Sequence, residues 1–96
     1  MVKSNEVSLK DAIEQMLHAY KLKGKIYEAQ LSQMWGNIVG KMIENHTHDL
    51  YLKNGKLYVK LDSAVLKQEL SYSRTKIKDQ VNQALGGNVV EEVVLL

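Results

Sequence analysis

The sequence predicts an α+β fold, a two-layer sandwich in which helices cover one face of a small three-stranded sheet. Apolar residues recur at helical spacing over residues 9–42 and again over residues 66–85. Between these stretches, two alternating segments flank Asn54-Gly55, and residues 89–96 are rich in β-branched side chains. The expected order of elements is therefore helix, helix, strand, strand, helix, strand.

The first helix is expected to begin after Ser8. Ser8 and Asp11 are spaced as in a capping box, with Asp11 in the positive first turn, and Gly24 is typical of a C-terminal stop. The helical spacing is carried by five apolar residues: Leu9, Ile13, Met16, Leu17 and Tyr20.

A second helix is expected from about Ile26. One apolar face of it consists of Leu31, Met34, Trp35, Ile38 and Met42. Gly36 and Gly40 weaken a helix by roughly 1 kcal/mol each relative to Ala, so we expect a kink or the close approach of another backbone there. Trp35 is interpreted as a core side chain that anchors this helix to the sheet, rather than as a platform for a ligand.

A β-hairpin is expected on both sides of Asn54-Gly55, which suits a type I′ turn. A two-residue loop pairs Lys53 with Lys56, and the register then pairs Leu52 with Leu57, Tyr51 with Tyr58 and Asp49 with Lys60. One face of the hairpin is core: Leu50, Leu52, Leu57, Val59 and Leu61. The other face carries Asp49, Tyr51, Lys53, Lys56, Tyr58 and Lys60.

A long third helix is expected after Asp62 or Ser63, either of which can cap it, and Gly86-Gly87 is expected to end it. Its buried stripe consists of Leu66, Leu70, Ile77, Val81 and Leu85. A basic stripe on a different face consists of Lys67, Ser71, Arg74 and Lys78. The segment that follows, residues 89–96, is expected to add the third strand.

Composition indicates one domain over residues 1–96, with residues 1–7 as a disordered tail. The absence of cysteine excludes disulfides and cysteine-based zinc sites. No apolar run is long enough to span a membrane, and the N-terminus has no apolar signal region, so we expect a cytoplasmic protein.

Catalytic patterns are not evident. No serine lies in a nucleophile elbow, no glycine-rich loop with a lysine resembles a phosphate cradle, and the acidic residues are scattered. His46 and His48 with Asp49 resemble part of a metal site, but a third ligand is not evident, and polar residues between a helix and a strand explain them more simply. We expect no enzyme activity, no cofactor, no metal and no small-molecule substrate.

Positive charge is concentrated in one segment. Residues 51–78 have a net charge of +5, residues 1–50 are balanced, and residues 79–96 contain three acids and no cation. Cations interleaved with aromatic side chains can neutralise phosphates and stack on unpaired bases, although Tyr and Lys are also ordinary residues on the exposed face of a small sheet. The candidate nucleic-acid-binding residues are Lys53, Lys56, Tyr58, Lys60, Lys67, Arg74 and Lys78.

An ordered set of short motifs resembles the DciA family over roughly residues 8–95. The motifs are Trp35-x-x-Ile38-Val39-Gly40, His46-Thr47, Gly55-Lys56-Leu57-Tyr58-Val59, Ser63-Ala64, Glu69-Leu70, and Val89-Val90 after Gly86-Gly87. The resemblance implies a K-homology-like fold and a role as a bacterial replicative helicase operator or loader. It also implies association with a DnaB-type helicase and with DNA, and hence a nucleoid-associated location in the cytoplasm.

Two departures from related patterns matter. Gly36 and Gly40 are separated by three residues, so the G-x-x-G loop of K-homology domains that clamp nucleic acid is not matched. Many relatives carry a flexible extension after the third strand, which this sequence does not contain, so contacts made by such an extension are not expected.

The leading hypothesis is a non-enzymatic DNA-replication accessory protein. It is expected to bind the replicative helicase, to contact single- or double-stranded DNA weakly and without sequence preference through the basic surface, and to aid helicase loading. No membrane contact is expected. The alternatives are a K-homology-like RNA-binding module, for example one associated with ribosomes, and a protein-interaction adaptor whose basic surface is merely solvated.

Overall fold

Helix α2 is the longest element of the computed structural model, which describes residues 8–96. The prediction of a tail over residues 1–7 lies outside the described residues. The elements in chain order are α2 (Leu9–Val39), α3 (Lys41–Asn45), β1 (Thr47–Lys53), β2 (Lys56–Leu61), α4 (Ala64–Ser71), α5 (Arg74–Leu85) and β3 (Glu92–Leu95). The predicted α+β class with a three-stranded sheet is confirmed.

The sheet has the order β1-β2-β3. Strands β1 and β2 are antiparallel with the predicted pairs, including Tyr51 with Tyr58, and Asn54 and Gly55 both have positive φ as a type I′ turn requires. Strand β3 pairs in parallel with β2, so Val94 lies beside Tyr58. The predicted hairpin and third strand are both confirmed.

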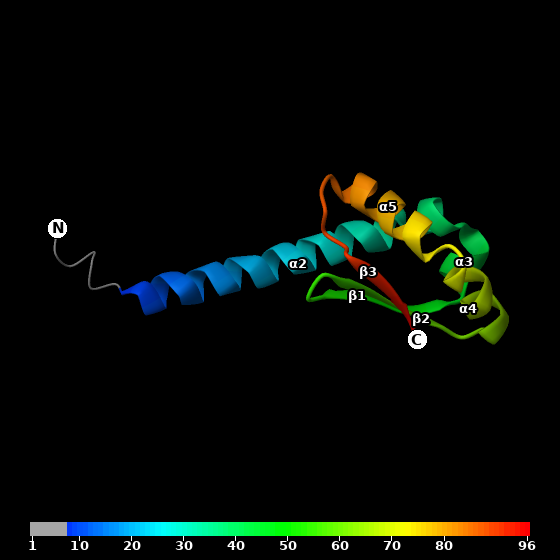
Figure 1. Cartoon of the computed structure of the whole chain (residues 1–96), viewed down its shortest axis with the longest axis horizontal. Helices are drawn as coiled ribbons and strands as arrows, with labels where there is room; N and C mark the ends of the chain where they lie inside the picture. The colour runs from blue at the N-terminus through cyan, green and yellow to red at the C-terminus, as the bar shows by residue number, and fades with distance from the viewer. Residues whose placement is uncertain (1–7) are drawn as a thin grey trace.

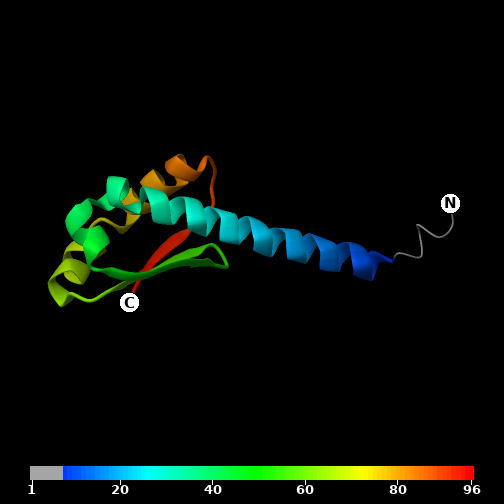
Figure 2. The same cartoon turned by 180° about the vertical axis from the view of Figure 1, so that it is seen from behind.

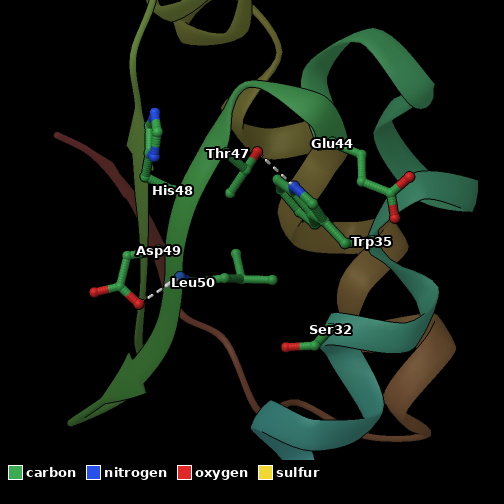
Figure 3. A pocket seen from close by; sticks show the side chains of 7 residues that line it. All are labelled: Ser32, Trp35, Glu44, Thr47, His48, Asp49 and Leu50. Carbon is green, nitrogen blue, oxygen red and sulfur yellow. Dashed lines mark hydrogen bonds between the residues drawn. The ribbon is translucent and has the colours of Figure 1, made fainter.

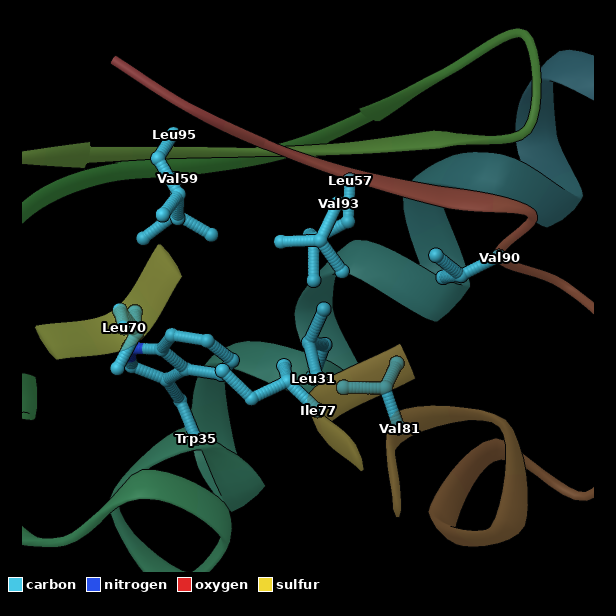
Figure 4. Close-up of a cluster of buried hydrophobic side chains, with 10 residues drawn as sticks. All are labelled: Leu31, Trp35, Leu57, Val59, Leu70, Ile77, Val81, Val90, Val93 and Leu95. Carbon is cyan, nitrogen blue, oxygen red and sulfur yellow. The ribbon is translucent and has the colours of Figure 1, made fainter. Parts of the chain in front are cut away.

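The core lies between the inner face of the sheet and a helical layer made by α5 and the C-terminal half of α2 (Figures 1 and 4). Its buried side chains are Leu31, Trp35, Leu57, Val59, Leu70, Ile77, Val81, Val90, Val93 and Leu95. The prediction that Trp35 is a core residue is confirmed, since it is only 2% exposed.

The predicted break at Gly24 is wrong, because α2 runs without interruption from Leu9 to Val39. A glycine inside a helix costs about 1 kcal/mol relative to Ala, and the good helix formers on both sides can absorb that cost. Gly24 also lacks the positive φ of a glycine stop. The capping box is not formed, because Ser8 is at the N-cap position but makes no side-chain capping bond.

The C-terminal end of α2 is at Gly40, whose φ of +95° ends the helix and allows α3 to fold back beside it. Gly36 lies inside α2, and a Cβ there would come within 2.5 Å of the Glu44 carboxylate from α3. We expected another backbone close to these glycines, but it is the Glu44 side chain that lies close to Gly36. In place of the expected kink, the helix ends at Gly40.

The predicted long third helix is two helices, α4 and α5, separated at Tyr72-Ser73. The run Ser71-Tyr72-Ser73 has poor helix propensity, and the Ser71 hydroxyl donates to the Gln68 carbonyl at 2.5 Å. The predicted ends are confirmed: Ser63 Oγ accepts from the Leu66 amide at 3.2 Å, and Gly86 ends α5 in the left-handed conformation.

The N-terminal half of α2 projects beyond the sheet (Figures 1 and 2), which gives the molecule principal extents of 61 × 22 × 20 Å. The apolar residues that predicted a helix here, from Leu9 to Tyr20, are all exposed. Within residues 8–96, no helix combines the length and the apolar character needed to cross a membrane.

Candidate nucleic-acid interface

The outer face of the sheet carries the hairpin side chains that the sequence singled out. Because Leu57 and Val59 point into the core, their neighbours on β2 point outward. Those neighbours are Lys56, Tyr58 and Lys60, and their cross-strand partners Lys53, Tyr51 and Asp49 share the same face. Four of the seven predicted residues, Lys53, Lys56, Tyr58 and Lys60, therefore lie together.

Tyr51 and Tyr58 form the centre of this face. Their ring centroids are 4.8 Å apart and their planes differ by 9°, so the rings stack on one another. Such a cross-strand aromatic pair also stabilises the sheet. The result is an aromatic surface, with the lysines of the hairpin on both sides of it along the strands.

The outer face is less positive than the segment charge of residues 51–78 indicates. On this face Glu92 of β3 is paired with Lys56, with Nζ and Oε2 3.7 Å apart, and Asp49 lies opposite Lys60. The Glu91 amide donates to the Gly55 carbonyl at 2.7 Å, which holds a second acid beside the turn. Acidic residues that are distant in sequence thus lie beside the basic hairpin and reduce its net positive charge.

The remaining three predicted residues lie elsewhere. Lys67 is exposed on α4, which contacts β2, whereas Arg74 and Lys78 are on α5 in the helical layer. The predicted basic stripe through Lys67, Ser71, Arg74 and Lys78 is not continuous, because the break at Tyr72-Ser73 changes the helix direction (Figure 1). The seven residues therefore do not make one surface.

Sequence reasoning missed a hollow of about 320 Å³ beside the hairpin turn. It is formed by α2, the turn and the segment that precedes β3, and its lining includes Tyr20, Lys23, Gly24, Tyr27, Leu52 and Lys53. Lys23 Nζ is 5.7 Å from the Tyr27 ring centroid. The lysine-rich run 21–25 was visible in the sequence, but only the tertiary structure places Lys23 near Lys53.

The two histidines considered as metal ligands turn to Asp62 instead of Asp49. His46 Nδ1 is 2.7 Å from one Asp62 oxygen and His48 Nε2 is 2.8 Å from the other. The hydrogen bonds from His46 and His48 hold the pKa of Asp62 below its ordinary value of 3.8. Among residues 8–96, no three His, Cys, Asp or Glu side chains are arranged to hold a metal ion.

A second hollow of about 320 Å³ lies beside Trp35, between α2, α3 and β1 (Figure 3). Its polar lining consists of Ser32, Glu44, Thr47, His48 and Asp49. Trp35 Nε1 donates to Thr47 Oγ1 at 3.0 Å, and Asp49 accepts from the Leu50 amide.

Comparison with known proteins gives one family. The sequence profile described as Dna[CI] antecedent, DciA, matches residues 8–95, which is nearly the whole chain. No curated protein matches the sequence.

Proposed function

Because this chain belongs to the DciA family, which is associated with helicase loading in DNA replication, we propose that it binds the replicative helicase directly and contacts DNA. The observation that carries the proposal is the family match over residues 8–95, since it covers both layers of the fold. The finer statements, about which surfaces act and how, are supported by the geometry of the sheet and of α2.

DNA contact is proposed for the outer face of the sheet. Lys53, Lys56 and Lys60 are exposed there and lie along the Tyr51–Tyr58 pair. Lysines neutralise phosphates as point charges, and exposed aromatic edges and faces favour contact with unpaired bases. Lysine contacts to phosphate carry no sequence information, so the binding is weak and without sequence preference.

Helicase loading is proposed to use binding energy instead of ATP hydrolysis by this chain. A protein that binds one helicase conformation, or one helicase–DNA geometry, more tightly than another shifts the population toward it. Holding DNA near the bound helicase adds a second, weaker contact to the same assembly.

Purified components test the proposal. The chain is mixed with the replicative helicase of the same organism, and complex formation and helicase loading onto DNA are measured. We expect a complex at micromolar concentrations and faster loading. No complex at tens of micromolar, with unchanged loading, would contradict the proposal.

Matched charge variants test the DNA face separately. Lys56→Gln with Lys60→Gln should weaken binding to labelled single-stranded DNA and leave helicase binding intact. Arg74→Gln with Lys78→Gln removes the same charge from the helical layer and should leave DNA binding nearly unchanged. Equal losses in both variants would contradict the assignment to the sheet, and tighter binding to RNA than to DNA would favour the RNA-binding alternative.

A further inference from the structure

The projecting half of α2 carries an apolar stripe that nothing in the described chain covers. It consists of Leu9, Ile13, Met16, Leu17 and Tyr20, and these side chains are between 46% and 77% exposed. The opposite side of the same turns is polar, with Asp11, Glu14 and His18 close together. A helix with one apolar face of this kind is typical of an element that packs against another surface.

The stripe continues the face of α2 that builds the core. At roughly 3.6 residues per turn, Met16 and Tyr20 lie in line with Tyr27 and Leu31. Leu31 is buried against the sheet. The sheet ends at its hairpin turn, whereas α2 runs on beyond it (Figure 2). A partner bound to the stripe would therefore lie beyond the hairpin turn, in the position that the sheet would occupy if its strands were longer.

The hollow beside the hairpin turn lies at the base of this stripe. Tyr20 belongs to both, and Tyr27 and Leu52 add apolar walls. A Cβ built on Gly24 would have no atom within 4 Å, so the helix leaves this space open. Because α2 is fixed to the hairpin by the Leu52 amide, which donates to Glu28 at 3.1 Å, the hollow is part of a defined surface.

The border of the stripe is basic. On a helical projection Lys10 and Lys23 are the charged residues nearest to the stripe, one on each flank, and Lys53 adds a third cation at the hollow. Lys21 and Glu14 are further from the stripe than Lys10, on the same flank of the helix. In a second copy of the helix, the charged residues nearest to the stripe would again be lysines and not carboxylates. The charge pattern thus favours a partner with carboxylates around an apolar surface over a second copy.

We propose that this stripe, together with the hollow at its base, is the surface that docks on the helicase, and that it takes an apolar helicase surface bordered by carboxylates. This inference rests on the proposed function. The stripe lies on the projecting part of α2, whereas the proposed DNA face is the outer face of the sheet. Lys53 borders both surfaces, but the other residues of the two contacts are separate, so a change among those residues in one contact leaves the other intact.

The test uses the full chain and the purified helicase. Ile13→Glu with Met16→Glu places two charges in the stripe, and Glu keeps the helix propensity high. Gln15→Glu with Leu22→Glu adds the same two charges on another face of the same helix. We expect the stripe variant to bind the helicase about 30-fold or more weakly, because a charge buried in the core of an interface is costly. The control should stay within about threefold of the wild-type affinity, because its charges lie outside the proposed interface.

Two further measurements complete the test. Helical circular dichroism and DNA affinity should be equal in the wild type and both variants. Reversing the border with Lys10→Glu and Lys23→Glu should slow association and reduce its dependence on salt concentration, as expected for rim charges.

Several results would overturn the inference. Equal helicase affinity of the stripe variant and the wild type would refute the docking surface and leave the proposed function standing. A dimer in light scattering that the stripe variant disrupts, without loss of helicase binding, would assign the stripe to a second copy. Stripe-dependent flotation with phosphatidylglycerol vesicles, again without an effect on the helicase, would assign it to a membrane. Failure of the wild type to bind helicase would refute both proposals.

Discussion

Replacing Thr47 with Val tests how the core tryptophan is held. The Thr47 hydroxyl accepts from Trp35 Nε1 at 3.0 Å and donates to the Ile43 carbonyl at 2.6 Å. It therefore links α2, α3 and β1 through one oxygen atom. Val has almost the same shape as Thr, so the substitution removes both hydrogen bonds and leaves the packing around the ring in place.

The expected loss is set by the Trp35 N–H, which is left without its partner beside the core. An unsatisfied buried donor costs about 1–3 kcal/mol, and the total stability of a domain of this size is roughly 5–14 kcal/mol. A loss of about 1–3 kcal/mol lowers the melting temperature by about 5–20 °C. Trp35→Ala costs about 3–5 kcal/mol by cavity formation, which removes much of the stability.

Urea unfolding followed by tryptophan fluorescence measures the effect, because Trp35 is the single tryptophan. Thr75→Val on the exposed surface of α5 is the matched control and should change stability by less than about 0.5 kcal/mol. A double-mutant cycle with Trp35→Phe, followed by circular dichroism, isolates the hydrogen bond. If Thr47→Val costs the same in the Trp35 and Phe backgrounds, the bond contributes nothing and the reasoning is wrong.

Three further predictions concern charge, backbone and pH. For about three phosphate contacts, the slope of log affinity against log salt on single-stranded DNA should be about −2, and Lys56→Gln with Lys60→Gln should bring it near −1; an affinity that does not depend on salt contradicts the lysine face. Gly40→Ala should destabilise the domain by more than about 1 kcal/mol, because Gly40 has a positive φ. Gly24→Ala should stabilise α2 by up to about 1 kcal/mol, because a Cβ there meets no other atom. Equal effects of the two substitutions in thermal melts would contradict the assignment of the helix end. Since the pKa of Asp62 is lowered in the fold, its stabilising contribution is present above pH 3.8 and is lost as the pH falls through the lower folded value; Asp62→Asn should remove that part of the pH dependence in acid unfolding, and an unchanged profile contradicts it.

The hairpin could be predicted from the sequence because its determinants are local. Asn54-Gly55 selects the turn, the turn sets the register, and the alternation of residues then assigns each face. Trp35 could be assigned to the core for a similar reason, since it shares a helical face with Leu31. These elements need no information about distant parts of the chain.

The helix boundaries could not be predicted in the same way. Gly24 and Gly40 look alike in sequence, yet α2 continues through the first and ends at the second, where φ is positive. Whether a glycine ends a helix depends on the packing of the segment that follows it. After Gly40, α3 packs back against α2 and leads into β1. The break at Tyr72-Ser73 was visible only as a run of poor helix formers.

The candidate site illustrates the limit of counting charge along the chain. The net charge of +5 over residues 51–78 is divided between two layers, and Glu92 returns from the C-terminal strand to pair with Lys56. Conversely, Lys23 joins Lys53 at the hairpin turn although thirty positions separate them. Which charges share a surface is determined by the pairing of the strands and the packing of α2 on the sheet. Both depend on contacts between residues that are distant in sequence.

A weak DNA face would suit the role beside a helicase that we propose. A few lysines with nearby acids would give an affinity for DNA that ordinary salt concentrations reduce strongly, so the isolated chain would hold DNA only briefly. If α2 docks on the helicase as proposed, the sheet is confined near any DNA that the helicase meets, and the effective concentration of that DNA rises toward the millimolar range. Weak contacts are then sufficient during loading, and they release DNA readily afterwards. The separation between the apolar stripe of α2 and the outer face of the sheet would allow both proposed contacts at once.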